Sequence, residues 1–87
     1  MNKIFHEKGF EDVLYWQATD KKIFKKINDL IKDIDRNGYN CKGKPEKLKG
    51  NFSGWWSVRI DEKNRLIFKI ENEMIEIYQC KEHYSDK

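Results

Sequence analysis

The stretch that decides the fold spans residues 55–71 and reads WWSVRIDEKNRLIFKIE. Apolar side chains recur at every second position in each half, on either side of a polar centre: Trp56, Val58, Ile60, Leu66, Phe68 and Ile70. A period of two is typical of a strand that buries one face. The stretch therefore predicts a β-hairpin that contributes one apolar face to a core.

The polar centre sets the strand register, because a slip of one residue would turn every apolar side chain to the wrong face. We predict that Asp61 pairs with Arg65 around a three-residue loop in which Asn64 takes the left-handed conformation. The cross-strand pairs are then Ile60 with Leu66, Val58 with Phe68, and Trp56 with Ile70. This register makes Arg59 and Arg65 project from neighbouring strands on the face opposite the core.

The segments around the hairpin supply another strand and two helices. After a two-residue turn at Asn72 and Glu73, residues 74–81 alternate as a last strand. Upstream, Thr19 is the expected N-cap of a helix that ends at Asn37 and Gly38. Its apolar stripe has helical spacing: Ile23, Phe24, Ile27, Leu30, Ile31 and Ile34.

A first helix over residues 7–17 and a short edge strand over residues 3–6 precede this helix, and an irregular, glycine-rich segment follows it from Tyr39 to Gly54. Helices that come first and strands that come after indicate an α+β fold. The expected architecture is two N-terminal helices packed on one face of a twisted antiparallel β-sheet.

The composition favours one folded domain over residues 1–87, because a chain of 87 residues has room for a single modest core. The net charge of +3 suits an anionic partner without demanding one. We expect a cytoplasmic protein, since no signal peptide or membrane-spanning run is visible. Cys41 and Cys80 are expected to be free thiols. Lysines crowd one segment: Lys42, Lys44, Lys47 and Lys49.

The residues alone point to acid-base chemistry if they point to catalysis at all. No nucleophile elbow, phosphate-binding glycine loop or cluster of metal ligands is present, so neither a cofactor nor a metal is expected. RNA needs neither, because its 2′-hydroxyl can attack the adjacent phosphate when a base, an acid and cations assist. A loop glutamate such as Glu46 and a tail histidine such as His83 are more often surface residues. Without further information, a generic binding domain is favoured over a nuclease, and His6 is interpreted as structural.

A wider set of short motifs favours the nuclease over the binding domain. They are Leu14-Tyr15-Trp16-Gln17, Thr19-Asp20-Lys21, Lys25-Lys26-Ile27-Asn28, Gly43-Lys44-Pro45-Glu46, Leu48-Lys49, Ser53-Gly54, Trp56-Ser57, Arg59-Ile60, Arg65-Leu66 and His83-Tyr84. Through these motifs nearly the whole chain resembles the YoeB (Txe) toxins of bacterial toxin-antitoxin pairs, within the RelE-like superfamily. The resemblance implies a compact α+β domain and ribosome-dependent cleavage of mRNA in the ribosomal A site.

The resemblance also implies roles for individual residues. Glu46 is the expected general base, His83 the general acid and Arg65 the main cation at the transition state. Tyr84 would orient the substrate or stack on it. Lys44, Lys49 and Arg59 would bind RNA phosphates. His83 and Tyr84 would lie on opposite sides of a continuing strand, so the last strand must bend or end before His83.

The partners implied by the resemblance are mRNA, the 70S ribosome and a YefM-like antitoxin, with a homodimer as a further possibility. Operator DNA would be bound only together with the antitoxin, and no membrane is involved. The alternative is a non-catalytic domain that binds RNA or a partner with the same basic face. A DNA-binding component acting alone is disfavoured, because no recognition helix is apparent.

Overall fold

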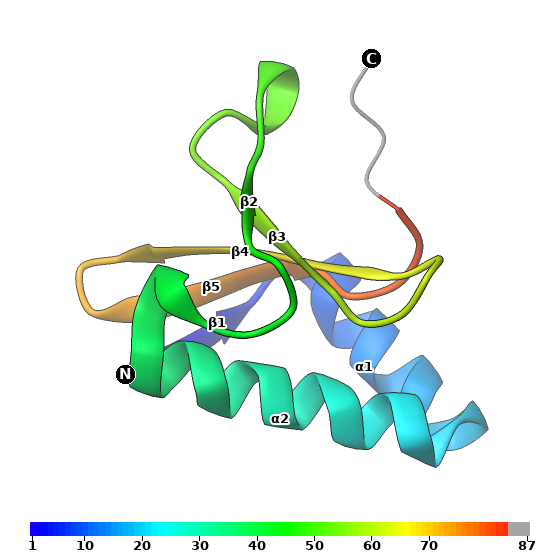
Figure 1. Ribbon diagram of the computed structural model, residues 1–87. Coiled ribbons are helices and arrows are strands. Elements are labelled where there is room, and N and C mark those ends of the chain that lie inside the picture. The colour runs from blue at the N-terminus through cyan, green and yellow to red at the C-terminus, as the bar shows by residue number, and fades with distance from the viewer. Residues whose placement is uncertain (84–87) are drawn as a thin grey trace.

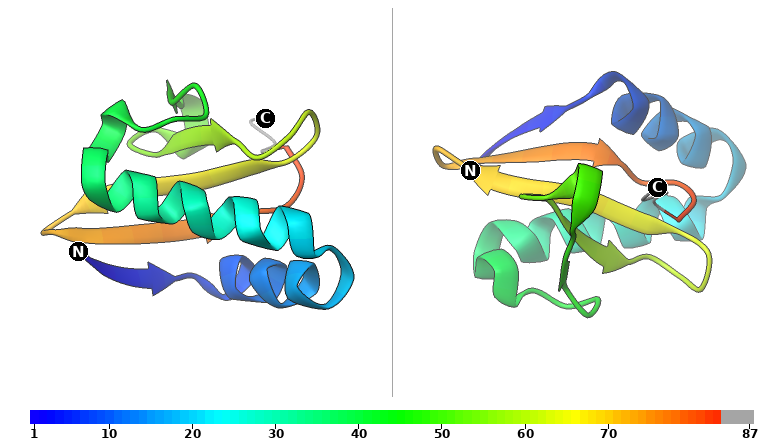
Figure 2. Two further views of the ribbon diagram at one scale, coloured as in Figure 1. Left: turned by 60° about the horizontal axis from the view of Figure 1, so that its bottom comes forward. Right: turned by 90° about the horizontal axis from the view of Figure 1, so that it is seen from above.

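The protein is described by a computed structural model, and the structure describes residues 1–83 (Figure 1). Its elements, in chain order, are β1 (Asn2–Phe5), α1 (Glu7–Thr19), α2 (Lys21–Asn37), the 3-10 turn η1 (Gly38–Asn40), β2 (Glu46–Lys47), the 3-10 turn η2 (Gly50–Phe52), β3 (Trp56–Arg59), β4 (Arg65–Glu71) and β5 (Met74–Gln79). The two helices lie together on one face of the sheet (Figure 2). The predicted α+β architecture is confirmed.

The sheet has five strands in the order β1-β5-β4-β3-β2. Three neighbouring pairs are antiparallel, but β1 runs parallel to β5, so the prediction of a wholly antiparallel sheet is wrong. A hairpin forces its strands to be antiparallel, whereas β1 and β5 are separated by most of the chain and are free of that constraint. The two-residue strand β2 was also missed, since so short a segment carries no periodicity.

The core lies between α2 and the sheet. Ile27 and Ile34 of α2 pack with Val58, Phe68 and Ile77 of the strands, and each of these side chains is at most 1% exposed. This confirms the apolar stripe predicted for the helix. No helix within residues 1–83 is long and apolar enough to cross a membrane.

The start of α2 differs from the prediction in one residue. Asp20, rather than Thr19, is the N-cap, and its carboxylate accepts hydrogen bonds from the backbone amides of Lys22 and Ile23. Thr19 ends α1 instead, and its hydroxyl donates to the carbonyl of Tyr15. A carboxylate at the cap also complements the positive end of the helix dipole, which explains why Asp20 outcompetes a hydroxyl.

The hairpin between β3 and β4 has the predicted strand faces but different cross-strand pairs. Arg59 pairs with Arg65, so the observed register is shifted by two residues and the predicted pairing of Asp61 with Arg65 is wrong. The observed pairs are Trp56 with Phe68, Ser57 with Ile67, Val58 with Leu66, and Arg59 with Arg65. A shift of two preserves the faces of both strands, so the two arginines still project from the same face.

The longer connection that causes this shift is built by Asp61. Its Oδ1 accepts from the backbone amides of Lys63, at 2.9 Å, and Asn64, at 2.7 Å, and so closes a local turn. The backbone amide of Ile60 donates to the carbonyl of Asn64 at 3.0 Å. Asn64 has a negative φ, unlike the prediction, whereas Asn72 and Glu73 both have positive φ and form the predicted turn between β4 and β5.

Both cysteines are free, as predicted, and the structure shows that both are buried. Burial, together with the carboxylate of Asp33, raises the pKa of the Cys41 thiol, and burial beside Asp12 raises the pKa of Cys80 to about 12. We therefore expect neither thiol of the native protein to react at an appreciable rate with a disulfide reagent at pH 8, because the thiolate is the reactive form. Both should react once guanidinium unfolds the chain. Absorbance of the released thiol measures the two rates, and rapid labelling of native Cys80 would contradict the structure.

Candidate active site

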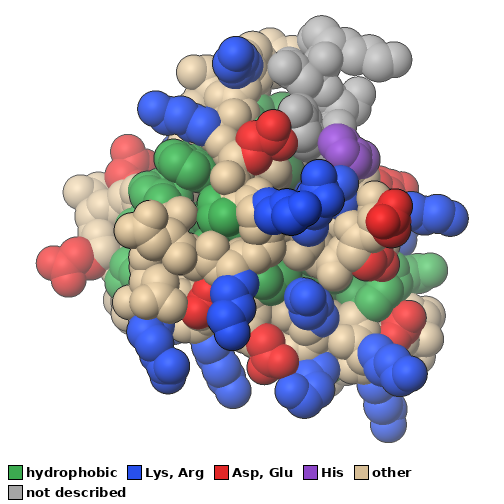
Figure 3. Space-filling view, viewed as in Figure 1, with side chains coloured by type: hydrophobic (Ala, Val, Ile, Leu, Met, Phe, Trp, Pro, Cys, Tyr) green, Lys and Arg blue, Asp and Glu red, His purple; other side chains and the backbone are tan. Residues whose placement is uncertain are grey.

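A polar cleft of about 310 Å³ lies on the sheet face opposite the helices. Seven residues line it: Lys44, Pro45, Glu46, Ser57, Arg59, Arg65 and His83. In the space-filling view a histidine side chain lies beside a group of Lys and Arg side chains (Figure 3). The cleft therefore brings one carboxylate and one imidazole together with three cationic side chains, although these residues come from four separate segments of the chain.

The loop before β2 carries Lys44 to the cleft and leads directly to Glu46, the first residue of β2. The carbonyl of Gly43 accepts a hydrogen bond of 2.8 Å from the backbone amide of Arg59, which fastens the loop to the end of β3. Gly43 has a φ of 92°, and a Cβ there would lie 3.1 Å from Val58 Cβ, so both the conformation and the close approach require glycine. Strand β2 then places Glu46 opposite Ser57.

Lys44 has an unusual backbone for a residue with a side chain. Its φ of 55° lies in the left-handed region, which costs a non-glycine residue about 1 kcal/mol or more. Backbone strain of this kind persists where neighbouring structure over-determines it, and it concentrates at functional sites. The conformation places Lys44 on the wall of the cleft, next to Glu46 and Arg59.

The guanidinium of Arg65 is held by the hairpin connection. Its Nη1 donates to the carbonyls of Asp61 at 2.7 Å, Asn64 at 3.1 Å and Glu62 at 3.3 Å. Three acceptors on one nitrogen fix the plane of the group, and within residues 1–83 no acceptor is assigned to its Nε or Nη2. Arg59 lies directly across the strand pair, so the cleft contains two adjacent guanidinium groups. Two guanidinium groups on one cleft, of which that of Arg65 is held by these bonds, are suited to a phosphate, whose oxygens match guanidinium geometry.

His83 reaches the cleft because β5 ends early. The strand stops at Gln79, and Glu82 adopts a φ of 70°, which turns the chain back toward β4. The carbonyl of Glu82 accepts a bond of 3.1 Å from the backbone amide of Arg65. The prediction that the last strand ends before His83 is therefore confirmed, and the imidazole lies on the same cleft as Glu46.

One candidate residue lies elsewhere, and another cannot be compared with the cleft. Lys49 is exposed and precedes η2, and it does not line the cleft. Tyr84 lies outside the described residues. Conversely, Ser57 lines the cleft and was not singled out from the sequence, although alternation along β3 had already placed it on the face of Arg59.

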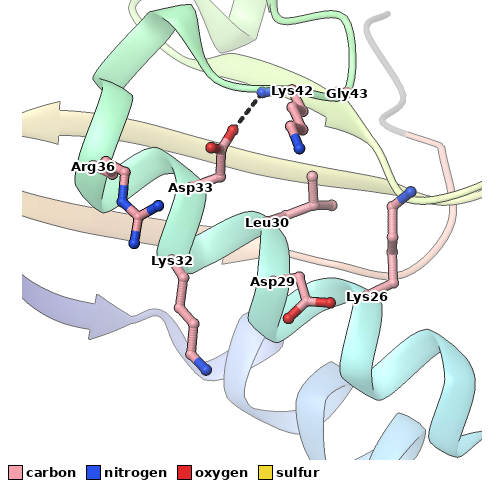
Figure 4. A pocket seen from close by; sticks show the side chains of 8 residues that line it. All are labelled: Lys26, Asp29, Leu30, Lys32, Asp33, Arg36, Lys42 and Gly43. Atoms are coloured by element: carbon pink, nitrogen blue, oxygen red, sulfur yellow. Dashed lines mark hydrogen bonds between the residues drawn. The ribbon is translucent and has the colours of Figure 1, made fainter.

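Two other hollows of the described chain contain neither Glu46 nor an imidazole. The larger, of about 640 Å³, shares Lys44, Arg59 and Arg65 with the cleft. The other, a cavity of about 450 Å³ beside α2, is lined by residues of both charges and by Leu30, with the carboxylate of Asp33 bonded to the backbone amide of Lys42 (Figure 4). It contains no imidazole and no pair of guanidiniums. Within residues 1–83, no group of three or more His, Cys, Asp or Glu side chains is placed to hold a metal ion. The cleft is therefore the strongest candidate for chemistry.

Known proteins share this fold and chain length. The YoeB/ParE toxin from Agrobacterium tumefaciens superposes with a TM-score of 0.93 at 36% identity, over 97% of this chain and 100% of that chain. The architecture is thus that of a small bacterial toxin. Residues 5–84 match the YoeB-like toxins of bacterial type II toxin-antitoxin systems, and the chain belongs to this family.

Individual relatives agree with this assignment. Toxin YoeB of Escherichia coli strain K12 is 50% identical over 84 residues, which cover 97% of this chain and 100% of the relative. Solved structures from Staphylococcus aureus include a YoeB-YefM complex, at 47% identity, and a YoeB dimer, at 48% identity. Both have a TM-score of 0.89 and cover 97% of this chain and 98% of the matched chain. The resemblance inferred from short motifs is confirmed at the level of the family.

Proposed function

We propose that this toxin is a ribosome-dependent endoribonuclease, which cleaves mRNA in the ribosomal A site by acid-base chemistry and thereby stops translation. The observation that carries the proposal is the shared cleft, in which Glu46 and His83 lie with Arg59 and Arg65. A carboxylate and an imidazole are able to move protons near neutral pH, and guanidinium groups stabilise charge that builds on a phosphate. This combination suits RNA, which provides its own nucleophile.

In the proposed reaction Glu46 accepts the proton of the 2′-hydroxyl while that oxygen attacks the adjacent phosphorus. The bond from phosphorus to the 5′-oxygen breaks, and His83 donates a proton to the departing oxygen. Arg65 stabilises the negative charge that accumulates on the phosphoryl oxygens, since its guanidinium is already oriented by three carbonyls. The products are a 2′,3′-cyclic phosphate and a 5′-hydroxyl, and no metal ion takes part.

The remaining candidate residues have supporting roles in this proposal. Lys44 and Arg59 bind phosphates at the cleft, and Lys49 binds the RNA backbone from its exposed position before η2. Tyr84 is proposed to orient the substrate or stack on a base. Because several of these contacts are to phosphates, binding should weaken as the salt concentration rises.

The proposed partners follow from the family and its solved relatives. The relative from Staphylococcus aureus is found with YefM and also as a dimer. We infer that a YefM-like antitoxin silences this toxin, that a homodimer is one of its states, and that operator DNA is bound only with the antitoxin. The 70S ribosome and its mRNA place the toxin in the cytoplasm.

Mapping RNA ends tests the function directly. The purified toxin is added to ribosomes that translate a defined message, and new ends are located by primer extension. We expect cuts within the translated frame, with 5′-hydroxyl ends that a polynucleotide kinase labels without prior dephosphorylation. The same message without ribosomes is the control and should remain intact. Binding to the ribosome with no new ends would instead favour the non-catalytic RNA-binding alternative.

A further inference from the structure

We propose that Asn64 is a positioning residue for the reaction, because its side chain fixes the backbone immediately before His83. Asn64 does not line the cleft, so its side chain acts on the substrate indirectly, through the residue that follows its bonding partner Glu82. The inference rests on the proposed function, in which His83 is the general acid. It adds to that function the requirement that the side chain of Asn64 holds the backbone before His83, which neither composition nor alternation of the sequence reveals.

The side chain of Asn64 is buried and is bonded at both ends. It is 8% exposed, and its Oδ1 accepts a hydrogen bond of 2.6 Å from the backbone amide of Glu82. Its Nδ2 donates to the two carboxylate oxygens of Asp61, at 3.1 and 3.2 Å. The bonds at Nδ2 fix the orientation of the amide, so its oxygen is held in place to receive Glu82.

Glu82, whose amide donates this bond, is in a costly conformation. Glu82 has a φ of 70°, and the left-handed region costs a residue with a Cβ about 1–2 kcal/mol. Two bonds hold it there, one from its amide to Asn64 and one from the amide of Arg65 to its carbonyl. Since His83 is the next residue, any relaxation of Glu82 moves the imidazole relative to the phosphate.

Other anchors of this segment lie further from His83. The carbonyl of Cys80 accepts from Trp16 Nε1 at 2.8 Å, and its amide donates to Asp12 at 3.0 Å. These bonds fix the end of β5, but two residues separate Cys80 from His83. Closer to His83, the side chain of Gln79 donates to the carbonyl of Lys81 at 3.2 Å, and Lys8 lies 3.9 Å from the carboxylate of Glu82. Among these anchors, Asn64 is the one that holds the backbone amide of the residue directly before His83.

Removal of this side chain should leave Arg65 in place. The acceptors of the Arg65 guanidinium are backbone carbonyls, which remain in any variant of Asn64. The Asp61 carboxylate still closes the loop through the backbone amides of Lys63 and Asn64. Hydrogen bonds from Asn64 and Lys63 outweigh the effect of burial and lower the pKa of Asp61, so this turn persists at neutral pH.

The test is a double-mutant cycle of Asn64→Ala and His83→Ala, measured as single-turnover cleavage of ribosome-bound mRNA. Asn64→Ala alone should lower the maximal rate by about tenfold to a hundredfold, the cost of a misplacement near 1 Å. The toxin concentration that gives half the maximal rate should change little. In the His83→Ala background the same substitution should have no further effect, because the group that it positions is gone.

Stability is separated from positioning by a matched control. Tyr39→Phe removes a hydroxyl that is bonded to the backbone of Ile70 on the helix side of the sheet, and it should lower the melting temperature without lowering the maximal cleavage rate. If Asn64→Ala does not fold, Asn64→Ser serves instead, since its shorter side chain no longer reaches the Glu82 amide.

The cycle distinguishes a failure of this inference from a failure of the proposed function. A rate loss from Asn64→Ala that is equally large in the His83→Ala background would show that Asn64 acts elsewhere, and an unchanged rate in the single variant would also overturn the proposal. His83→Ala with the rate of the unaltered toxin would overturn the proposed function itself. The two failures therefore give different results in the same experiment.

Discussion

Alanine at His83 is expected to lower the single-turnover rate of mRNA cleavage by about a hundredfold to ten-thousandfold, the usual contribution of one general acid. The 5′-oxygen is a poor leaving group unless it receives a proton as its bond to phosphorus breaks. His83 is the one imidazole on the described cleft, so no neighbouring histidine there replaces it. Ribosome binding should change little, since the cationic side chains of the cleft remain.

The other histidine of the chain provides the matched control. His6 directly follows β1, at the sheet edge opposite β2, and it does not line the cleft; its Nε2 is 3.1 Å from Glu76 and its ring contacts Trp55 and Tyr78. His6→Ala removes the same kind of side chain without touching the cleft, and cleavage should continue at the unaltered rate in folded protein. If His6→Ala and His83→Ala cut equally fast, the acid assigned here is wrong.

The faces of the hairpin were predictable because they depend only on alternation. Any register that shifts by an even number of residues keeps Val58 and Phe68 inward and Arg59 outward. The pairing itself depends on the connection, where Asp61 uses its side chain to bond two backbone amides. Such a local competition between side-chain and backbone acceptors is not visible in hydrophobic periodicity.

The residues of the candidate site could be predicted from the sequence, but the contacts that bring them together could not. Family motifs named Glu46, Arg65 and His83, and the structure lines one cleft with all three. What brings them together is non-local: Gly43 bonds to β3, and Asn64 bonds to the residue before His83. Contacts between segments so far apart in sequence leave no periodic signal, so spacing alone cannot reveal them.

The second large effect is expected for Gly9→Ala, and it concerns stability. Helix propensity alone would make alanine stabilising at this position, whereas we expect the substitution to destabilise the protein. Gly9 lies inside α1, where replacing glycine by alanine favours a helix by about 0.8–1 kcal/mol. The structure places a Cβ at this position 2.8 Å from the carbonyl oxygen of Ile77 and 3.2 Å from that of Tyr78. Both neighbours are backbone atoms of β5, which is paired on both sides and has little freedom to retreat.

We therefore expect Gly9→Ala to destabilise the protein by about 1–3 kcal/mol, as overpacking does in other close-packed interiors. For a domain of this size, each kcal/mol lowers the melting temperature by about 4–8 °C. Glu11→Ala, on the exposed side of the same helix, is the control and should melt within about 0.5 kcal/mol of the unaltered chain. Calorimetry at one protein concentration compares the three. A Gly9→Ala variant that melts higher would mean that α1 lies further from β5 than the structure places it, and that helix propensity rather than close packing determines which residue position 9 accepts.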